Sequence, residues 1–374
     1  MKNYDVAIVG ASFAGLALAR CTAAAGLAVV VLERKPEPGA RVHTTGILVP
    51  EAQREWPAPA RLCRSIERVR LYAPSLRSID LDRPGYRFLA TDTGELLRWY
   101  AGEAARAGAE VRCGALFRGA SEGAQDVTVT GHNIRARFLV GADGPRSPVA
   151  RAFGLGTNRE FLLGVEVELE GVAALPDALH CFLDSRLAPG YLAWVVPGLG
   201  VTQVGLATRL PARPQLHPFL ARVRSLFDLR RARIVGGRGG PIPVGGPVHP
   251  PARGRVLLAG DAAGLVSPLT AGGIHTALAS GRELGLAIRR HLLQRDRSPA
   301  ESLARLYPRH RTKRLLRAAL DRTPPNWLLD YGLRTPPLRA LARLVYFHHH
   351  GLLAPAAWAD LFARHRPHST DSVE

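Results

Sequence analysis

Two glycine-rich turns, far apart in the chain, constrain its fold most. The first is GASFAG at Gly10–Gly15, and the second is GDAAG at Gly260–Gly264, which continues into SPLTAGGI at Ser267–Ile274. Each turn follows an apolar run typical of a buried strand and enters a predicted helix. One such turn alone is a weak signal. Two of them, about 250 residues apart, predict a single long ligand held at both ends, and FAD is such a ligand.

The first turn has the features of a dinucleotide-binding fingerprint. Gly10 permits a tight turn after the strand, and Gly15 lets the next helix pack closely on that strand. Ser12 replaces the middle glycine, and its hydroxyl can donate to a phosphate. The helix N-terminus then favours the pyrophosphate through its free N–H groups and its dipole. Glu33 ends the second apolar run, where an acid accepts hydrogen bonds from ribose hydroxyls and disfavours a 2′-phosphate.

The second turn has the features expected beside a flavin ring. Asp261 ends a buried strand, where its carboxylate can accept a hydrogen bond from the ribityl chain. Gly264, Gly272 and Gly273 leave the backbone accessible, and the helix that starts near Gly272 directs positive charge toward the ring. Arg98, in a predicted helix over 95–108, can reach the pyrophosphate from the other side or remain a solvated helix arginine.

The chain is strongly basic. Its net charge is +19, and it comes almost entirely from arginine, because Lys2, Lys35 and Lys313 are the only lysines. Arginine with abundant Ala, Gly and Pro is typical of a GC-rich genome. It also suits an anionic partner such as a membrane surface, an acidic redox protein or a phosphorylated substrate. No nucleic-acid motif is present and aromatic residues are sparse, so we do not expect nucleic acid as a partner.

Cysteine spacing and hydropathy limit the class of protein further. The four cysteines are scattered without a C-x-x-C pair, which argues against a disulfide framework, a zinc site and an iron–sulfur cluster. The first apolar run is a short strand before a glycine turn rather than a signal peptide, and no apolar run reaches the ~18 residues of a spanning helix. We therefore expect a cytoplasmic protein, and its charge leaves a peripheral contact with the inner membrane face open.

The order of predicted elements gives the fold class. A strand–helix–strand unit opens the chain, residues 111–140 alternate like an antiparallel meander, and residues 161–208 read as further strands. We predict an α/β fold, in which a Rossmann-like FAD-binding three-layer domain carries an inserted antiparallel β-sheet substrate domain and a helical C-terminal region. The expected ranges are 1–72, 88–160 and 251–295 for the FAD-binding domain, 73–87 and 161–250 for the substrate domain, and 296–374 for the C-terminal region.

Three strings of residues carry a resemblance to a known group of enzymes. They are GASFAG at Gly10–Gly15, GADGPRS at Gly141–Ser147 and GDAAGLVSPLTAGGI at Gly260–Ile274. Together they resemble FAD enzymes of the p-hydroxybenzoate hydroxylase-like superfamily, and the resemblance covers most of the chain up to about Arg290.

Within that superfamily the chain is most similar to the geranylgeranyl reductase family. The hydroxylases usually carry His at the position of Gly264, whereas the small residue here is reductase-like. The segment PGYLAWVVP at Pro189–Pro197 is similar to the reductases' Trp-x-Phe-Pro stretch, with Val196 where Phe is common.

The resemblance implies hydride transfer from reduced flavin to a carbon–carbon double bond of an isoprenoid or other apolar, lipid-linked substrate. Tyr191 and Trp194 would line an apolar tunnel beside the flavin, although aromatic residues at these positions also suit a sheet core. Arg41 and the loop from His43 to Gly46 would pass by the flavin ring. Several relatives have Cys in this loop, so His43 is either a proton donor or a structural histidine.

These inferences give two sets of predicted site residues. The predicted catalytic residues are His43, Thr45, Tyr191 and Trp194. The predicted cofactor-binding residues are Gly10, Ala11, Ser12, Ala14, Gly15, Glu33, Arg34, Arg41, Gly46, Arg98, Asp143, Gly260, Asp261, Pro268, Gly272, Gly273 and Ile274. The electron donor is left open between NAD(P)H, which would bind transiently because no second fingerprint is present, and an acidic reduced ferredoxin.

Other branches of the superfamily remain as alternatives. The main one is an FAD-dependent monooxygenase of an apolar or aromatic substrate. A flavin halogenase is set aside, because it needs a lysine near the ring and none lies between Lys35 and Lys313. Isoprenoid cyclases place acids near the substrate, but Glu166, Glu168 and Glu170 alternate on a strand and equally suit a solvated sheet face.

The last quarter of the chain carries no motif of this kind. His348, His349 and His350 are neighbours that cannot all face one ion on a helix, so we expect no metal site. From Glu301 onward there are 12 Lys/Arg against 6 Asp/Glu, mixed with Leu and Trp. That mixture suits an interfacial helix that takes lipid from a membrane, or an ordinary lid over the substrate tunnel.

Overall fold

The strand–helix–strand unit forms at the N-terminus as predicted. It consists of β1 (Lys2–Val9), α1 (Phe13–Ala23) and β2 (Val29–Leu32), with β1 and β2 parallel. The structure is a computed structural model and describes residues 1–172, 175–307 and 310–347. All four residues of β2 are buried, which explains its uninterrupted apolar sequence, because a parallel strand is covered on both faces.

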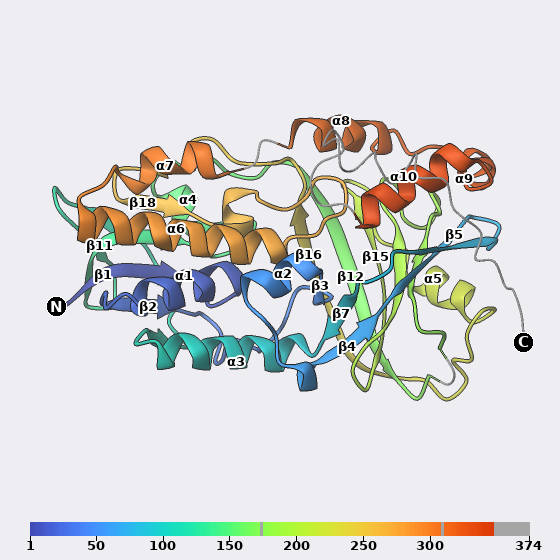
Figure 1. Ribbon diagram of the computed structural model, residues 1–374, viewed down its shortest axis with the longest axis horizontal. Helices are drawn as coiled ribbons and strands as arrows, with labels where there is room; N and C mark the ends of the chain where they lie inside the picture. The colour runs from blue at the N-terminus through green and yellow to red at the C-terminus, as the bar shows by residue number, and fades with distance from the viewer. Residues whose placement is uncertain (173–174, 308–309, 348–374) are drawn as a thin grey trace, which may run out of the picture.

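The first sheet has eight strands and occupies the half of the molecule that contains the N-terminus (Figure 1). Its main path, in spatial order, is β17 (Ala252–Arg253), β18 (Val256–Leu258), β11 (Ile134–Gly141), β1, β2 and β8 (Glu110–Arg112). Two more strands follow from β11, namely β10 (Val127–Val129) and β9 (Ala120–Glu122). Because β8 pairs in parallel with β2, the meander consists of β9 to β11 rather than all of residues 111–140.

Helix α1 packs between α6 (Ile274–Gln294) and α3 (Thr93–Arg106), as Figure 1 shows. The contact with α6 is unusually close. A Cβ atom at Gly281 of α6 would lie 2.2 Å from the carbonyl oxygen of Ala14, so only glycine fits there. The two predicted glycine turns, which precede α1 and α6, are thereby brought to neighbouring positions.

The second sheet has seven strands and forms the other half of the molecule. Its order is β16 (Arg233–Pro243), β12 (Phe161–Glu170), β15 (Thr202–Arg209), β14 (Ala193–Pro197), β13 (Leu179–Phe182), β5 (Arg68–Tyr72) and β6 (Ser78–Asp82). Neighbours pair antiparallel, as predicted, except β13 and β5, which are parallel. The sequence analysis did not predict β16, because four of its residues are glycines.

The division into domains remains a proposal, and one of its boundaries meets a difficulty. The boundary after Tyr72 assigns β5 to the first domain, whereas β5 is hydrogen bonded into the second sheet. A small sheet of three strands connects the two halves. It consists of β3 (Ile47–Leu48), β7 (Phe88–Thr91) and β4 (Cys63–Ile66).

The remaining helices cover the outside of the two sheets. They are α2 (Pro50–Glu55), α4 (Pro148–Ala152), α5 (Leu216–Val223), α7 (Pro299–Leu306), α8 (Arg311–Leu320), α9 (Asn326–Gly332) and α10 (Pro336–Phe347). The last three lie along one edge of the second half (Figure 1). None of the helices in the described segments is both long and apolar enough to cross a membrane. His348, His349 and His350 lie outside the described residues.

Candidate functional site

The first glycine turn is built so that backbone atoms come very close together. Gly10 has φ +107°, and a Cβ atom there would lie 2.3 Å from the carbonyl oxygen of Ala142. A Cβ atom at Gly15 would lie 2.0 Å from the carbonyl oxygen of Gly10. Both glycines are therefore required by the turn itself, which explains the spacing seen in the sequence.

The start of α1 offers free N–H groups to an anion. Ser12, the N-cap residue, is exposed and its side chain does not cap the helix, and the first turn contains no acidic residue. Glu33 is buried beside this turn, where it accepts hydrogen bonds from the backbone N–H of Ala11 (2.8 Å) and of Lys35 (3.0 Å). The acid and the glycine turn thus meet as a dinucleotide site requires.

The second glycine turn lies against the first. Gly260 has φ +58°, and a Cβ atom there would lie 2.8 Å from the Cβ of Ala14. The carboxyl group of Asp261 is largely buried next to Gly273, and burial raises its pKa to about 6. Helix α6 begins directly after Gly273, with no side-chain cap and no acid in its first turn. An uncapped helix end beside a buried acid suits a polar, electron-rich ligand.

The other predicted cofactor-binding residues fall into two groups. Ala14 and Pro268 are buried, Gly46 is buried against Thr91 and Thr93, and Gly272 is exposed. Asp143 accepts a hydrogen bond from the N–H of Val149 at 2.9 Å, which gives it a structural task at the start of α4.

The predicted arginines lie on a neighbouring surface. Arg34 and Arg41 are exposed, and Arg41 has φ +47°. Arg98 is held by Glu37 through two hydrogen bonds of 2.9 and 2.6 Å, and it also pairs with Glu95. Its contact with a pyrophosphate therefore remains a proposal, which would require Arg98 to leave Glu37 or to bind both.

The loop from His43 to Gly46 is attached to the second sheet by several contacts. Arg238 Nη1 donates to the carbonyl oxygen of Thr44 (3.0 Å), and Gln203 Nε2 donates to that of Thr45 (3.1 Å). His43 Nδ1 lies 3.1 Å from the carbonyl oxygen of Gly239. A carbonyl can only accept, so Nδ1 carries the proton and Nε2 has a free lone pair. Because the imidazole is exposed, that nitrogen is accessible.

A buried carboxylate joins two of the predicted catalytic residues. Glu166 Oε2 accepts hydrogen bonds from Thr45 Oγ1 (2.7 Å) and Trp194 Nε1 (2.6 Å), and Glu166 Oε1 lies 2.8 Å from Nε of Arg238. Burial raises the pKa of Glu166, and the Arg238 guanidinium opposes that effect. Since an indole N–H and a guanidinium can only donate, this arrangement suits the ionised carboxylate.

On the other side of Trp194 lies the loop that precedes α6. Tyr191 donates from its hydroxyl to the carbonyl oxygen of Thr270 at 2.5 Å. Burial holds the pKa of Tyr191 well above its usual value, so the phenol stays protonated. The surrounding side chains are apolar, and they are Leu162, Ala207, Ile242, Val244 and Ala271. The His43–Gly46 loop and the loop that precedes α6 therefore both contact one apolar face of the second sheet.

The residues of this region fit FAD. The two glycine turns with their uncapped helix ends, the buried Glu33 and the half-buried Asp261 provide donors for phosphates and acceptors for hydroxyl groups in one place. If bound there, FAD would supply hydride chemistry between the His43–Gly46 loop and the apolar face.

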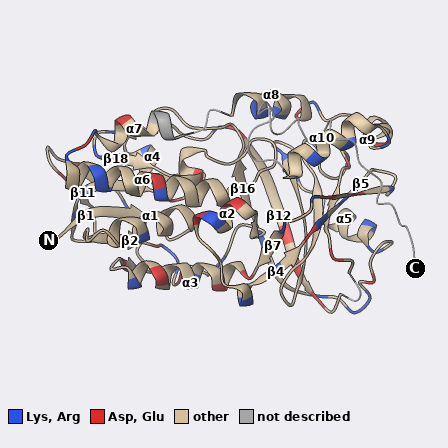
Figure 2. Cartoon of the chain, viewed as in Figure 1, with Lys and Arg blue, Asp and Glu red and all other residues tan. Residues whose placement is uncertain are grey.

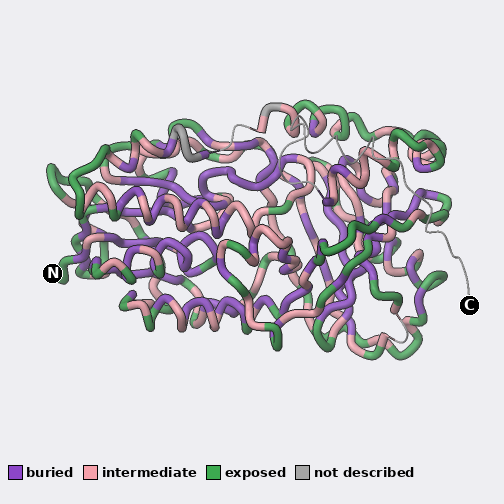
Figure 3. The backbone as a smooth tube through the Cα atoms, in the orientation of Figure 1, coloured by how far each residue is buried: buried purple, intermediate pink, exposed green. Residues whose placement is uncertain are grey.

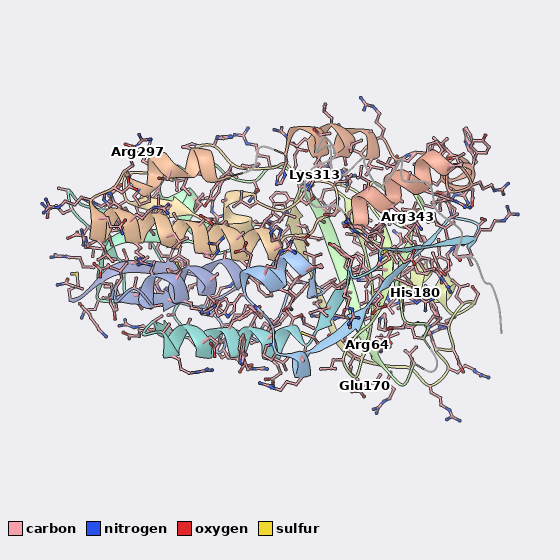
Figure 4. All side chains as sticks on the ribbon, in the orientation of Figure 1. Arg64, Glu170, His180, Arg297, Lys313 and Arg343 are labelled. Carbon is pink, nitrogen blue, oxygen red and sulfur yellow. The ribbon has the colours of Figure 1, made fainter. Side chains whose placement is uncertain are left out.

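The sequence analysis missed three residues of this arrangement. Glu166, Arg238 and Gln203 were not predicted site residues. The three alternating glutamates were left open between acids near the substrate and a solvated sheet face, and Glu166 is only 4% exposed. Exposure of the glutamate side chains increases along β12, from 3% at Glu166 to 30% at Glu168 and 46% at Glu170. Figure 4 labels Glu170 at the far end of the sheet.

Metal chemistry has no visible basis in the part of the chain that the structure describes, because no group of three or more His, Cys, Asp or Glu side chains gathers there.

Comparison with known proteins gives matches along most of the chain. Residues 5–98 match the FAD dependent oxidoreductase family, and residues 70–211 match a family described as FAD binding domain. Digeranylgeranylglycerophospholipid reductase 2 of Methanopyrus kandleri is 32% identical over 82% of this chain and 82% of its own length. The protein of the same name from Methanothermobacter thermautotrophicus is 31% identical over 74% of this chain and 75% of its own length.

Solved structures agree on the fold. A geranylgeranyl bacteriochlorophyll reductase-like protein from Thermoplasma acidophilum superposes with a TM-score of 0.82, at 24% sequence identity, over 98% of both chains. This similarity confirms the predicted α/β fold.

Proposed function

Because this chain belongs to the geranylgeranyl reductase family of FAD-dependent oxidoreductases, we propose that it reduces carbon–carbon double bonds of an isoprenoid lipid. Addition to each double bond consumes one hydride and one proton. The hydride comes from reduced FAD, which an external donor must regenerate. The protein binds the chain-like substrate, excludes water and holds the groups that move the proton.

The observation that carries this proposal is the apolar face around Trp194. Two loops that would border a flavin, His43–Gly46 and Ser267–Gly273, both contact this face. The charged groups beside it, Glu166 and Arg238, neutralise each other at 2.8 Å. An apolar face with its charges paired favours a hydrocarbon over a charged or aromatic-acid substrate.

We propose that His43 donates the proton that completes the addition to the double bond. His43 presents Nε2 with a free lone pair, while its Nδ1–H is fixed by Gly239. A histidine in this arrangement can take a proton from water and pass it to a carbon atom, as histidines do in general acid–base catalysis. Thr45, Tyr191 and Trp194 act differently, because their polar atoms are already engaged with Glu166 or Thr270. They shape the site and fix its loops.

The proposal includes the electron donor and the location of the protein. NAD(P)H or a small acidic protein such as reduced ferredoxin would bind transiently, and the net charge of +19 favours an acidic partner. We further propose a cytoplasmic enzyme with peripheral contact to the inner face of the membrane, where it would meet a lipid substrate.

An anaerobic experiment tests the proposed function. The flavin of the purified holoenzyme is reduced with dithionite, polyprenyl lipids are added one at a time, and flavin absorbance and substrate mass are followed. Reoxidation without oxygen, with a gain of two hydrogens per double bond, is the expected result. A flavin that stays reduced until air is admitted, followed by gain of an oxygen atom in the substrate, would instead identify a monooxygenase.

A pair of variants tests the proton assignment. His43→Gln should slow the anaerobic reoxidation by about 100-fold, the usual contribution of a general acid. His132→Gln is a matched control, because His132 is a half-buried histidine whose ring also contacts a carbonyl oxygen, that of Leu116, far from the site. Equal rates in the two variants would contradict the role of His43.

A further inference from the structure

Helix α9 is oriented with its polar side chains toward the protein and its apolar side chains toward solvent. Asn326 Nδ2 donates to Asp184 (2.9 Å), and Asp330 accepts a hydrogen bond from the N–H of Ser75 (3.1 Å). These two contacts fix the helix to the second sheet at both of its ends.

The opposite side of α9 exposes large apolar and aromatic residues. Trp327 is 70% exposed, Tyr331 is 63% exposed and Leu328 is 43% exposed. Figure 3 shows α8 and α9 as a mainly exposed edge of the molecule. An ordinary surface helix has the reverse orientation, with its apolar side buried. Among the residues that the structure describes, the exposed side of α9 therefore has no partner, and the polar side holds it in place.

Helix α8 extends this surface. Leu315 is 74% exposed and Leu320 is 36% exposed, whereas Leu316 packs against the buried Leu344 of α10, as does Leu269 in the loop that precedes α6. Figure 4 places Lys313 on the side of α8 that faces the rest of the molecule, away from this apolar edge. The surface is thus connected through Leu344 to a loop that borders the proposed flavin site.

The charges around this surface are mainly positive. Arg314, Arg322, Arg334 and Arg339 are exposed, and within the described residues none of them forms an ion pair. Of the two nearby acids, Asp321 pairs with Arg317 and Arg209, whereas Asp330 bonds to Ser75 and keeps its negative charge. Figure 2 shows the basic positions on α8 and α10. The unpaired arginines outnumber this acid, so the surface is positive overall.

We propose that the exposed side of α8 and α9 docks on an anionic lipid bilayer, with Trp327 and Tyr331 at the level of the headgroups. Trp and Tyr favour that level because one end of each ring is polar, and arginines there attract anionic headgroups. This inference rests on the proposed function only in the purpose that it gives to docking, which is delivery of a lipid to the loop that contains Leu269. Binding itself requires neither substrate nor turnover.

Flotation with vesicles tests the docking surface. Holoenzyme is mixed with phosphatidylcholine vesicles, with or without phosphatidylglycerol, at low and high salt. The intact protein should float with the anionic vesicles and be released partly by salt. A double variant, Trp327→Ser with Tyr331→Ser, should bind at least about 10-fold more weakly, because interfacial aromatic side chains and buried apolar area supply much of such binding.

Controls separate this surface from general stickiness. The matched control is Ile234→Ser with Val235→Ser, since these residues are 60% and 48% exposed on β16, outside α8 and α9. It should bind vesicles like the intact protein. A second variant, Arg322→Gln with Arg334→Gln, should lose the preference for anionic vesicles and its sensitivity to salt.

Three outcomes would overturn the proposal. They are an intact protein that floats with neither vesicle, a control pair that loses as much binding as the α9 pair, and an α9 variant that changes only the oligomeric state. FAD content and anaerobic reduction of a detergent-solubilised lipid should be unchanged in every variant. If the intact protein does not reduce the lipid, the proposed function is refuted, and the result of the vesicle experiment still applies to the docking surface.

Discussion

Replacement of Glu166 by Gln should destabilise the protein far more than replacement of Glu168, although both pair with Arg238. Glu166 is 3% exposed and Arg238 is 11% exposed, so Glu166→Gln removes the charge of a buried ion pair and turns an amide N–H₂ toward a guanidinium. Breaking a buried pair in this way costs ~3–5 kcal/mol. Gln keeps one oxygen that can accept from Thr45 and Trp194, so we expect the lower limit, about 3 kcal/mol.

Glu168→Gln is the matched control, because Glu168 is on the same strand and binds the same arginine but is 30% exposed. Exposed pairs contribute ~0–1 kcal/mol. Urea unfolding followed by circular dichroism measures both variants, with the slope checked for two-state behaviour. Midpoints that fall by the same amount would refute the argument, since they would show that burial does not distinguish the two glutamates.

Function should follow stability in this pair. Glu166→Gln releases the His43–Gly46 loop from one of its attachments, so the rate of substrate-driven flavin reoxidation should fall while FAD content is retained. The Glu168 variant should react at the normal rate.

Three further predictions concern the cofactor turns and acid stability. Gly10→Ala should abolish FAD retention and destabilise the fold by at least ~1–3 kcal/mol, whereas Gly26→Ala, at φ +80° with open space around it, should retain FAD; equal FAD retention would contradict the close-approach argument. Asp261→Ala should weaken FAD binding by about 10- to 100-fold in a fluorescence titration, the cost of one hydrogen bond to a charged group, and full retention would refute the assignment. Burial lowers the pKa of His310 from 6.5 to about 4. Between pH 6.5 and 4 only the unfolded chain then gains this proton, so the free energy of unfolding falls over that range and is unaffected above it. His310→Gln should reduce that loss by about 1–2 kcal/mol after allowance for solvent screening. An acid-unfolding curve that is the same for the variant and the intact protein would contradict this prediction.

Local rules made the cofactor half of the fold predictable. Gly10, Gly15 and Glu33 lie within a single strand–helix–strand unit, so their spacing along the chain determines their arrangement in space. Gly260 and Asp261 could be assigned for the same reason, because a strand–turn–helix unit positions them. The failure at residues 111–140 is different. Alternating apolar residues occur both in β8, which pairs in parallel with β2, and in the antiparallel strands of the meander. The alternation therefore does not show which strand a segment pairs with.

The substrate half depended on contacts between segments that are distant in sequence. Periodicity predicted that Glu166, Glu168 and Glu170 share one face of β12. It could not predict that the loop carrying Thr45 covers only the first of them, because that contact spans 121 residues. Arg238 could not be assigned to the site, because it lies in the glycine-rich β16, whose composition is not that of a typical strand.

The same reasoning explains why α9 could not be understood from its sequence. Trp327, Leu328, Asp330 and Tyr331 form an ordinary mixed helical segment, and composition alone allows either side to face the protein. The direction is set by Ser75 and Asp184, which lie in the loops that follow β5 and β13 of the second sheet and bond the polar side. Once those bonds are made, the aromatic side has no place in the core. The exposed tryptophan is then a consequence of how the helix is fixed, and an exposed apolar patch of this kind is typical of an interaction surface, in keeping with the proposed docking on a bilayer.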